Sequence, residues 1–140
     1  MIDMDIEKLI PHRNSMKLIE EIIELDDNHC ITAATVSPRW PLYEDGYVHS
    51  IILIELVAQT AGVSFGWHEM HKKEPSGKLG WLVGIKKARF FQDRIPVNSK
   101  IVISIQEQKR DDAYAEISGT ARVDSEIIGE MDLQVFRPES

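Results

Sequence analysis

The stretch IILIELVAQTAGVSFGW, residues 51–67, decides the fold class of this 140-residue chain. Its length approaches that of a membrane span. Glu55 and Gln59 lie inside it, however, and a carboxylate at the centre of a span is costly in lipid. A helix that is apolar nearly all round is instead typical of the buried centre of a globular domain. We therefore predict one buried helix that continues to about His71 as the sequence becomes polar.

Strand patterns lie on both sides of this helix. Residues 16–25 favour a strand, with a helix as the alternative, and the β-branched residues 29–37 favour another strand. After the helix, period-2 alternation is typical of antiparallel strands with one solvated face. Four strands are predicted there, over residues 79–91, 100–108, 113–123 and 127–136.

The remaining segments are predicted to be loops, turns or a short helix. Residues 38–47 indicate a loop, because they hold Pro38, Pro41 and an Asp45–Gly46 turn signal. Residues 5–10 favour one short helix that Pro11 stops. The short Asp111–Asp112 and Asp124–Ser125 segments indicate hairpin turns between the later strands.

This order of elements predicts an α+β fold in which one antiparallel sheet wraps around one long central helix. No linker or repeat divides the chain, so residues 1–140 are expected to form a single domain. Such a sheet leaves an edge strand and part of the helix exposed. We therefore expect pairing with a second subunit.

The composition excludes several classes of function. A net charge of −7, from 16 basic and 23 acidic residues, argues against binding to nucleic acid or to an anionic membrane. A single cysteine, Cys30, excludes an internal disulfide and a cysteine-based metal site. The acidic N-terminus does not resemble a signal peptide. We expect a cytoplasmic protein with no metal and no cofactor.

Glu55 is the first candidate for chemistry. A carboxylate in a buried apolar helix is costly unless it is paired or neutralised. Loss of solvent favours its protonated form, which suits a general acid or base. The alternative is that Glu55 faces a subunit boundary or bonds to Gln59, one helical turn further on. Gly62 and Gly66 continue this stripe and either admit a ligand or allow close packing.

A second candidate is the pair His49–Ser50, at the predicted start of the helix. Ser50 is a plausible N-cap, and the N–H groups there can polarise a carbonyl oxygen because a helix N-terminus is partly positive. His49 is either a base or an exposed residue at the entrance to the helix.

In order along the chain, four segments resemble the hot-dog-fold β-hydroxyacyl-acyl carrier protein dehydratases. IPHR at residues 10–13 is similar to the family's opening segment, and IELVAQTAG at 54–62 is similar to its central-helix motif. LVGIKKARF at 82–90, followed by IPVN at 95–98, is similar to its ARF strand and the turn after it. SGTARVDSEIIGEMDL at 118–133 is similar to its last hairpin.

The loop before the helix departs from the family pattern. The family has a catalytic histidine in a Gly-His-Phe motif, and counting back 14 residues from Glu55 reaches Pro41 instead. The family's Pro-Gly pair at the helix entrance falls on His49–Ser50. These features are similar to a divergent branch, the predicted 3-hydroxyacyl-acyl carrier protein dehydratases of aryl-polyene-type gene clusters.

The resemblance implies roles for five residues. Glu55 would be the catalytic acid, and the Ser50 N–H would hold the thioester carbonyl. His49 would replace the missing catalytic base. Gln59 and Gly84 would contact the substrate.

The implied reaction is dehydration of 3-hydroxyacyl thioesters to trans-2-enoyl thioesters in fatty-acid or polyene-type synthesis. The implied partner is an acyl carrier protein bearing acyl-phosphopantetheine. The protein itself would be a homodimer, a higher homo-oligomer or a heterodimer with another hot-dog dehydratase. Two alternatives remain open: a partner-dependent or non-catalytic subunit that binds acyl carrier protein, and an acyl thioesterase.

Overall fold

The computed structural model describes residue 6 and residues 17–70, 82–110 and 114–136 of the chain. Most of these residues form six strands of one sheet and a single helix, α1, spanning Ile52–Met70. The six strands are β1 Glu21–Leu25, β2 His29–Thr35, β5 Leu82–Phe90, β7 Lys100–Arg110, β8 Tyr114–Val123 and β9 Glu126–Phe136.

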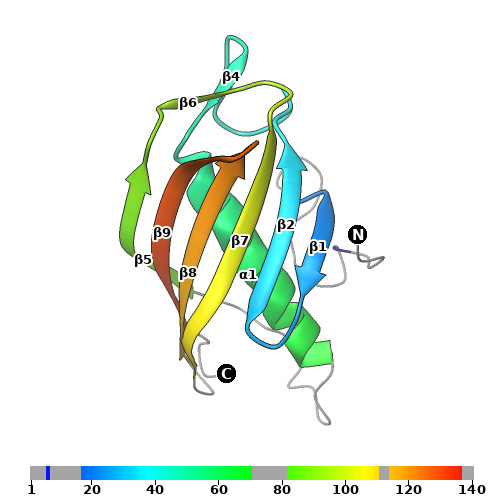
Figure 1. Cartoon of the computed structure of the whole chain (residues 1–140), viewed down its shortest axis with the longest axis vertical. Helices are drawn as coiled ribbons and strands as arrows, with labels where there is room; N and C mark the ends of the chain where they lie inside the picture. The colour runs from blue at the N-terminus through cyan, green and yellow to red at the C-terminus, as the bar shows by residue number, and fades with distance from the viewer. Residues whose placement is uncertain (1–5, 7–16, 71–81, 111–113, 137–140) are drawn as a thin grey trace.

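The sheet has the order β1-β2-β7-β8-β9-β5, and all neighbouring strands are antiparallel. It curves around α1, which crosses its concave face diagonally (Figure 1). The predicted α+β arrangement of one antiparallel sheet around one central helix is therefore confirmed. The helix also starts and ends close to its predicted bounds, although His71 lies outside the described residues.

Alternation along the strands places apolar side chains against the helix. In β7, Ile101, Ile103 and Ile105 are buried, while the residues between them are partly exposed. The helix contributes Leu53, Leu56 and Val57 to the same core. Burial of a leucine or isoleucine side chain is worth roughly 1.5–3 kcal/mol, so this contact dominates the stability of the fold.

The helix approaches the sheet closely at two glycines. A Cβ atom added to Gly119 in β8 would lie 2.6 Å from Val57 Cγ1. One added to Gly129 in β9 would lie 2.7 Å from Leu53 Cδ1. These two positions set how deeply α1 lies in the concave face, because any side chain there would push the helix outward.

The loop predicted over residues 38–47 is wrong in part, because the structure has a small hairpin there. Strands β3 (Tyr43–Glu44) and β4 (Tyr47–His49) pair with each other, and β6 (Arg94–Pro96) adds a third strand. Asp45 and Gly46 have φ values of 47° and 92°, as a two-residue hairpin turn requires. Strands this short have too few residues for alternation to be detected.

Other boundaries also differ from the predictions. The first strand begins at Glu21, not at residue 16, and it is a strand and not the alternative helix. The two-residue turn at Asp124–Ser125 is confirmed, since Val123 pairs directly with Glu126. The helix predicted over 5–10 and the turn at 111–112 lie outside the described residues, apart from Ile6. Within the described residues, no helix combines the length and apolar character needed to cross a membrane.

We predict that Gly119→Ala lowers the free energy of unfolding by about 1–3 kcal/mol, because the new methyl group overlaps Val57. Urea denaturation measures this loss. The matched control is Gly84→Ala in β5, where the nearest atom to an added Cβ is Gln134 Oε1 at 3.7 Å. Its unfolding free energy should not fall by more than about 0.5 kcal/mol. Equal losses in the two variants would contradict the role assigned to close helix–sheet contact.

Candidate active site

Glu55 lies in the first turn of α1, on the one face of the helix that the chain leaves partly open. The open face repeats at helical spacing. It comprises Ile51 in the turn before the helix and the partly exposed residues Ile54, Glu55, Ala58, Gly62 and Gly66. The opposite face packs on the sheet. A carboxylate therefore stands at the border between an apolar core and an uncovered apolar stripe.

Edge strand β5 presents a second uncovered apolar surface on the same concave side. Val83, Ile85 and Phe90 pair in register with Val135, Leu133 and Gly129, which face the core. They should be buried as well, yet they are 43%, 53% and 36% exposed. Ile51, just before the helix, is 54% exposed. The open face of α1 and the inner face of β5 together form a surface that this chain alone does not cover.

Gln59 is entirely buried and bonded to Glu55. Its Nε2 donates to Glu55 Oε1 at 3.0 Å, one helical turn apart on the same face. Its Oε1 accepts the backbone N–H groups of Leu18 at 3.0 Å and Ile19 at 3.4 Å. The alternative raised from the sequence, a hydrogen bond between Gln59 and Glu55, is present. Contact between Gln59 and substrate stays a prediction.

The start of the helix differs from the expectation for Ser50. The Ser50 N–H donates to the carbonyl of Asp93 at 3.0 Å, so in this conformation it is not available to a thioester oxygen. The Ser50 carbonyl instead accepts the Leu53 N–H at 3.0 Å and forms the first turn. Among the described residues, the N–H groups of Ile51 and Ile52 have no backbone acceptor. These two donors lie at the N-terminal end of α1, where the Ser50 N–H was predicted to act.

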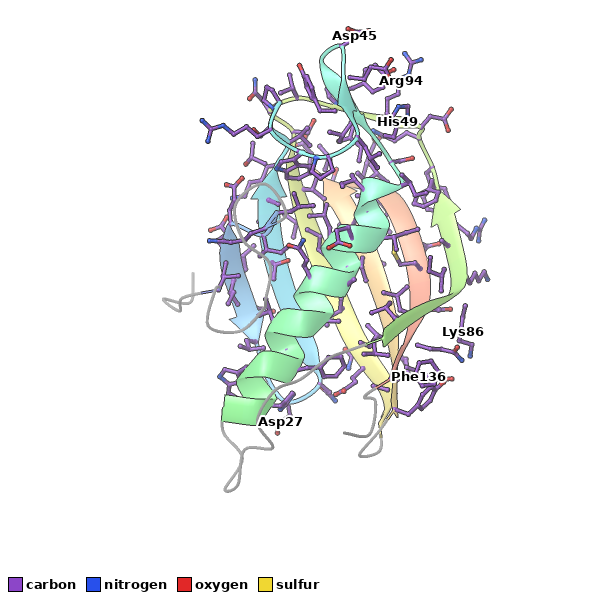
Figure 2. The ribbon with its side chains drawn as sticks, turned by 180° about the vertical axis from the view of Figure 1, so that it is seen from behind. Asp27, Asp45, His49, Lys86, Arg94 and Phe136 are labelled. Carbon is purple, nitrogen blue, oxygen red and sulfur yellow. The ribbon has the colours of Figure 1, made fainter. Side chains whose placement is uncertain are left out.

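His49 lies on the β3–β4 hairpin, beyond the N-terminal end of the helix (Figure 2). Its side chain is 46% exposed, and its Nε2 is 3.3 Å from Glu44 Oε2. The ring makes an edge contact with Tyr47, and Arg94 Cζ lies 4.4 Å from the centroid of the Tyr47 ring. A carboxylate at one ring nitrogen orients a histidine for general-base chemistry through the other.

Gly84 lies on β5 opposite Gln134, whose side chain is on the outer face of the sheet. A side chain at this position would therefore point away from the helix and from Glu55. The structure thus brings together Glu55, Gln59 and the start of the helix. It places His49 on the hairpin and Gly84 on the outer face of the sheet edge.

Sequence reasoning missed four groups at this site. Asp93 and Glu44 partner the predicted residues Ser50 and His49, and the backbone of Leu18 and Ile19 partners Gln59. Three of these lie about 40 residues away in sequence from the groups they bind, and no local pattern could have predicted them. Only the contact of Glu44 could have been predicted locally, because the Asp45–Gly46 turn brings the strand of Glu44 beside the strand of His49.

A family model described as ApeP-like, ApeP dehydratase, matches residues 4–140. The chain belongs to the ApeP-like dehydratase family. This membership confirms the resemblance predicted from the four ordered segments, including the divergent branch.

Curated relatives of this ApeP-like chain are dehydratases. It is 30% identical over 133 residues to the 3-hydroxyacyl-[acyl-carrier-protein] dehydratase FabZ of Streptococcus uberis, with 91% of each chain covered. It is 29% identical over 133 residues to the FabZ of Streptococcus pyogenes serotype M49, again with 91% of each chain covered.

Solved structures confirm the hot-dog fold. A chain of the dehydratase heterocomplex ApeI:P from Xenorhabdus doucetiae superposes with a TM-score of 0.85 at 24% identity, covering 98% of this chain and 93% of that one. An HP0420 homologue from Helicobacter felis superposes with a TM-score of 0.72 at 17% identity, covering 100% and 94%. At these identities the likeness is evidence for the fold alone.

Cys30 is buried in β2, and burial raises the pKa of its thiol to about 12, with a smaller contribution from the charge of Asp26. The thiolate is the reactive form of cysteine. We therefore predict that the folded protein at pH 8 reacts with a disulfide reagent roughly a thousandfold more slowly than an unperturbed thiol. The same protein in guanidinium chloride is the control and should react at the ordinary rate. Fast labelling of the folded protein would contradict the burial described.

Proposed function

We propose that this chain takes part in dehydration of 3-hydroxyacyl thioesters on an acyl carrier protein to trans-2-enoyl thioesters, with Glu55 as the general acid. The products would serve fatty-acid or polyene-type synthesis in the cytoplasm. One observation carries the proposal. In a chain of the ApeP-like dehydratase family, Glu55 lies at the edge of the core on the open face of the central helix, next to uncovered apolar surface.

The chemistry needs three groups. A base removes the proton from the carbon next to the thioester carbonyl, and negative charge develops on the carbonyl oxygen. The bond between the third carbon and its hydroxyl then breaks, and the hydroxyl leaves as water with the proton of Glu55. The N–H groups of Ile51 and Ile52 are our candidates to stabilise the carbonyl oxygen, because they lie at the positive end of α1.

His49 is the candidate base within this chain. With the Nε2–H of His49 donating to Glu44 Oε2, Nδ1 is the ring atom that would take the substrate proton. The hairpin that holds this pair occupies the loop in which the family has its histidine. In this arrangement, a second copy of the chain would bring His49 of one subunit to Glu55 of the other.

A second arrangement has a separate observation in its favour. No histidine stands at Pro41, where the family pattern has one, and the structural neighbour from Xenorhabdus doucetiae is a dehydratase heterocomplex. In this arrangement a different hot-dog subunit covers the open face of α1 and the inner face of β5. That partner supplies the histidine, and this chain supplies Glu55.

The deciding experiment incubates the purified protein with 3-hydroxyacyl-acyl carrier protein, alone and with a second hot-dog protein. Mass spectrometry of the acyl-phosphopantetheine arm detects the loss of one water. Turnover in either mixture supports the proposal, whereas intact substrate in both overturns it. Free acid in place of enoyl thioester would favour the thioesterase alternative.

We predict that Glu55→Gln lowers kcat by about 10²–10⁴-fold, because an amide cannot give a proton to the leaving hydroxyl. The measurement is the rate of water loss in whichever mixture is active. The matched control is Glu126→Gln, which removes an exposed carboxylate from β9 and should leave the rate within about twofold. Wild-type turnover by Glu55→Gln would rule out its role as the acid.

His49→Ala separates the two arrangements. If His49 is the base, we expect His49→Ala to lose about 10²–10⁴-fold in kcat and Glu44→Gln to lose less, because the latter only misorients the ring. If a partner subunit supplies the base, both variants should keep turnover within about threefold once the partner is present. Gel filtration of the mixtures reports whether the partner is bound.

A further inference from the structure

We propose that Gln59 is a positioning residue that fixes the carboxyl group of Glu55 and connects it to the segment entering β1. This inference rests on the proposed function, because it takes Glu55 to be the acid. Gln59 is the largest polar side chain that is fully buried among the described residues, with 0% exposure. A buried amide is retained only where its hydrogen bonds are satisfied.

The surroundings determine which way the amide points. Its oxygen accepts two backbone N–H groups, from Leu18 and Ile19, and a rotated amide would present its NH₂ group to those donors. The NH₂ group must therefore face Glu55, to which it donates at 3.0 Å. The direction of this hydrogen bond is set by groups outside the helix.

Leu18 and Ile19 need this partner. Pairing of β1 with β2 begins only at Glu20, whose N–H donates to the Ala33 carbonyl. Leu18 and Ile19 are 2% and 0% exposed, so an unsatisfied N–H there would cost about 1–3 kcal/mol. The side chain of Gln59 takes the place of a neighbouring strand for these two residues. It thereby docks their segment against the helix, one turn from Glu55.

This arrangement assigns different roles to the two carboxyl oxygens of Glu55. An amide NH₂ can only donate, so Glu55 Oε1 is held as an acceptor in both protonation states. The proton that leaves with the hydroxyl of the substrate is therefore carried on Oε2. Loss of the Gln59 bond would remove this restraint on Oε1 and would misplace that proton.

Two substitutions test this role. Gln59→Glu keeps an oxygen for the two backbone N–H groups but loses the donor toward Glu55, so two carboxyl groups face each other. We expect at least a tenfold loss of kcat where both are ionised, and recovery at lower pH where they share one proton. Gln59→Met should lose about tenfold to a hundredfold in kcat at every pH, with KM within about twofold.

The matched control is Thr60→Val, which removes the neighbouring buried hydroxyl that bonds to Thr32 at 2.7 Å. It should lose stability without a change in the pH profile of kcat. A purely structural Gln59 predicts a loss of stability and an unchanged kcat for Gln59→Met, which places no new charge beside Glu55. Wild-type kcat in folded Gln59→Met would therefore overturn the proposal.

A measurement without substrate separates this inference from the proposed function. In ¹⁵N NMR spectra, the side-chain amide of Gln59 and the backbone amides of Leu18 and Ile19 should shift together as Glu55 titrates. Glu55→Ala should abolish that shift. If wild-type protein shows this coupling but no dehydration with any partner, the proposed function fails while the link stands. If the amides do not respond to Glu55, the positioning role fails whatever the activity.

Discussion

Coverage of the central helix is the constraint on which the rest of this structure depends. Residues of α1 are apolar nearly all round, so every face must be shielded from water. The sheet shields the face that holds Leu53, Leu56 and Val57. The segment at Leu18 and Ile19 covers Gln59. The stripe of partly exposed residues that includes Glu55, beside Gln59, remains open.

The position of the carboxylate follows from this packing. Gly119 and Gly129 let the helix lie deep in the concave sheet. The Gln59 amide donates a hydrogen bond to the Glu55 carboxyl group. The Glu55 carboxyl group therefore lies between the core and the open stripe of α1. A hydrogen bond to a charged group at such a border is stronger than one in water, because fewer water molecules compete for it.

Sequence periodicity predicted the parts of the fold that depend on repeated burial. Alternation at Ile101, Ile103 and Ile105 located β7, and the uninterrupted apolar run from Ile51 located the helix. Strands β3, β4 and β6 were not predicted, since two or three residues cannot show a period. Their only local signal was the Asp45–Gly46 turn.

The candidate site was predicted in its residues but not in its contacts. Glu55 and Gln59 are one helical turn apart, and helix geometry alone predicts that they meet. The acceptor that occupies the Ser50 N–H, Asp93, comes from a loop 43 residues later. Such a partner depends on how β6 lies beside β4, which is a tertiary property. For this reason the sequence could not show that the Ser50 N–H, at the start of the helix, is already bonded to Asp93.

In the proposed arrangement that uses His49 as the base, the position of His49 on the hairpin implies a site completed by two chains. Within one chain, His49 is held on the exposed side of the hairpin by Glu44 and Tyr47, whereas Glu55 faces the open stripe of α1. The apolar side chains that border this stripe, Ile51 and Ile85, are more than half exposed, which is costly for a folded chain on its own. A second subunit that covers them would also exclude water from Glu55. In the function that we propose, the surface that calls for a partner is also the surface on which Glu55 acts, so assembly and catalysis would depend on the same uncovered face.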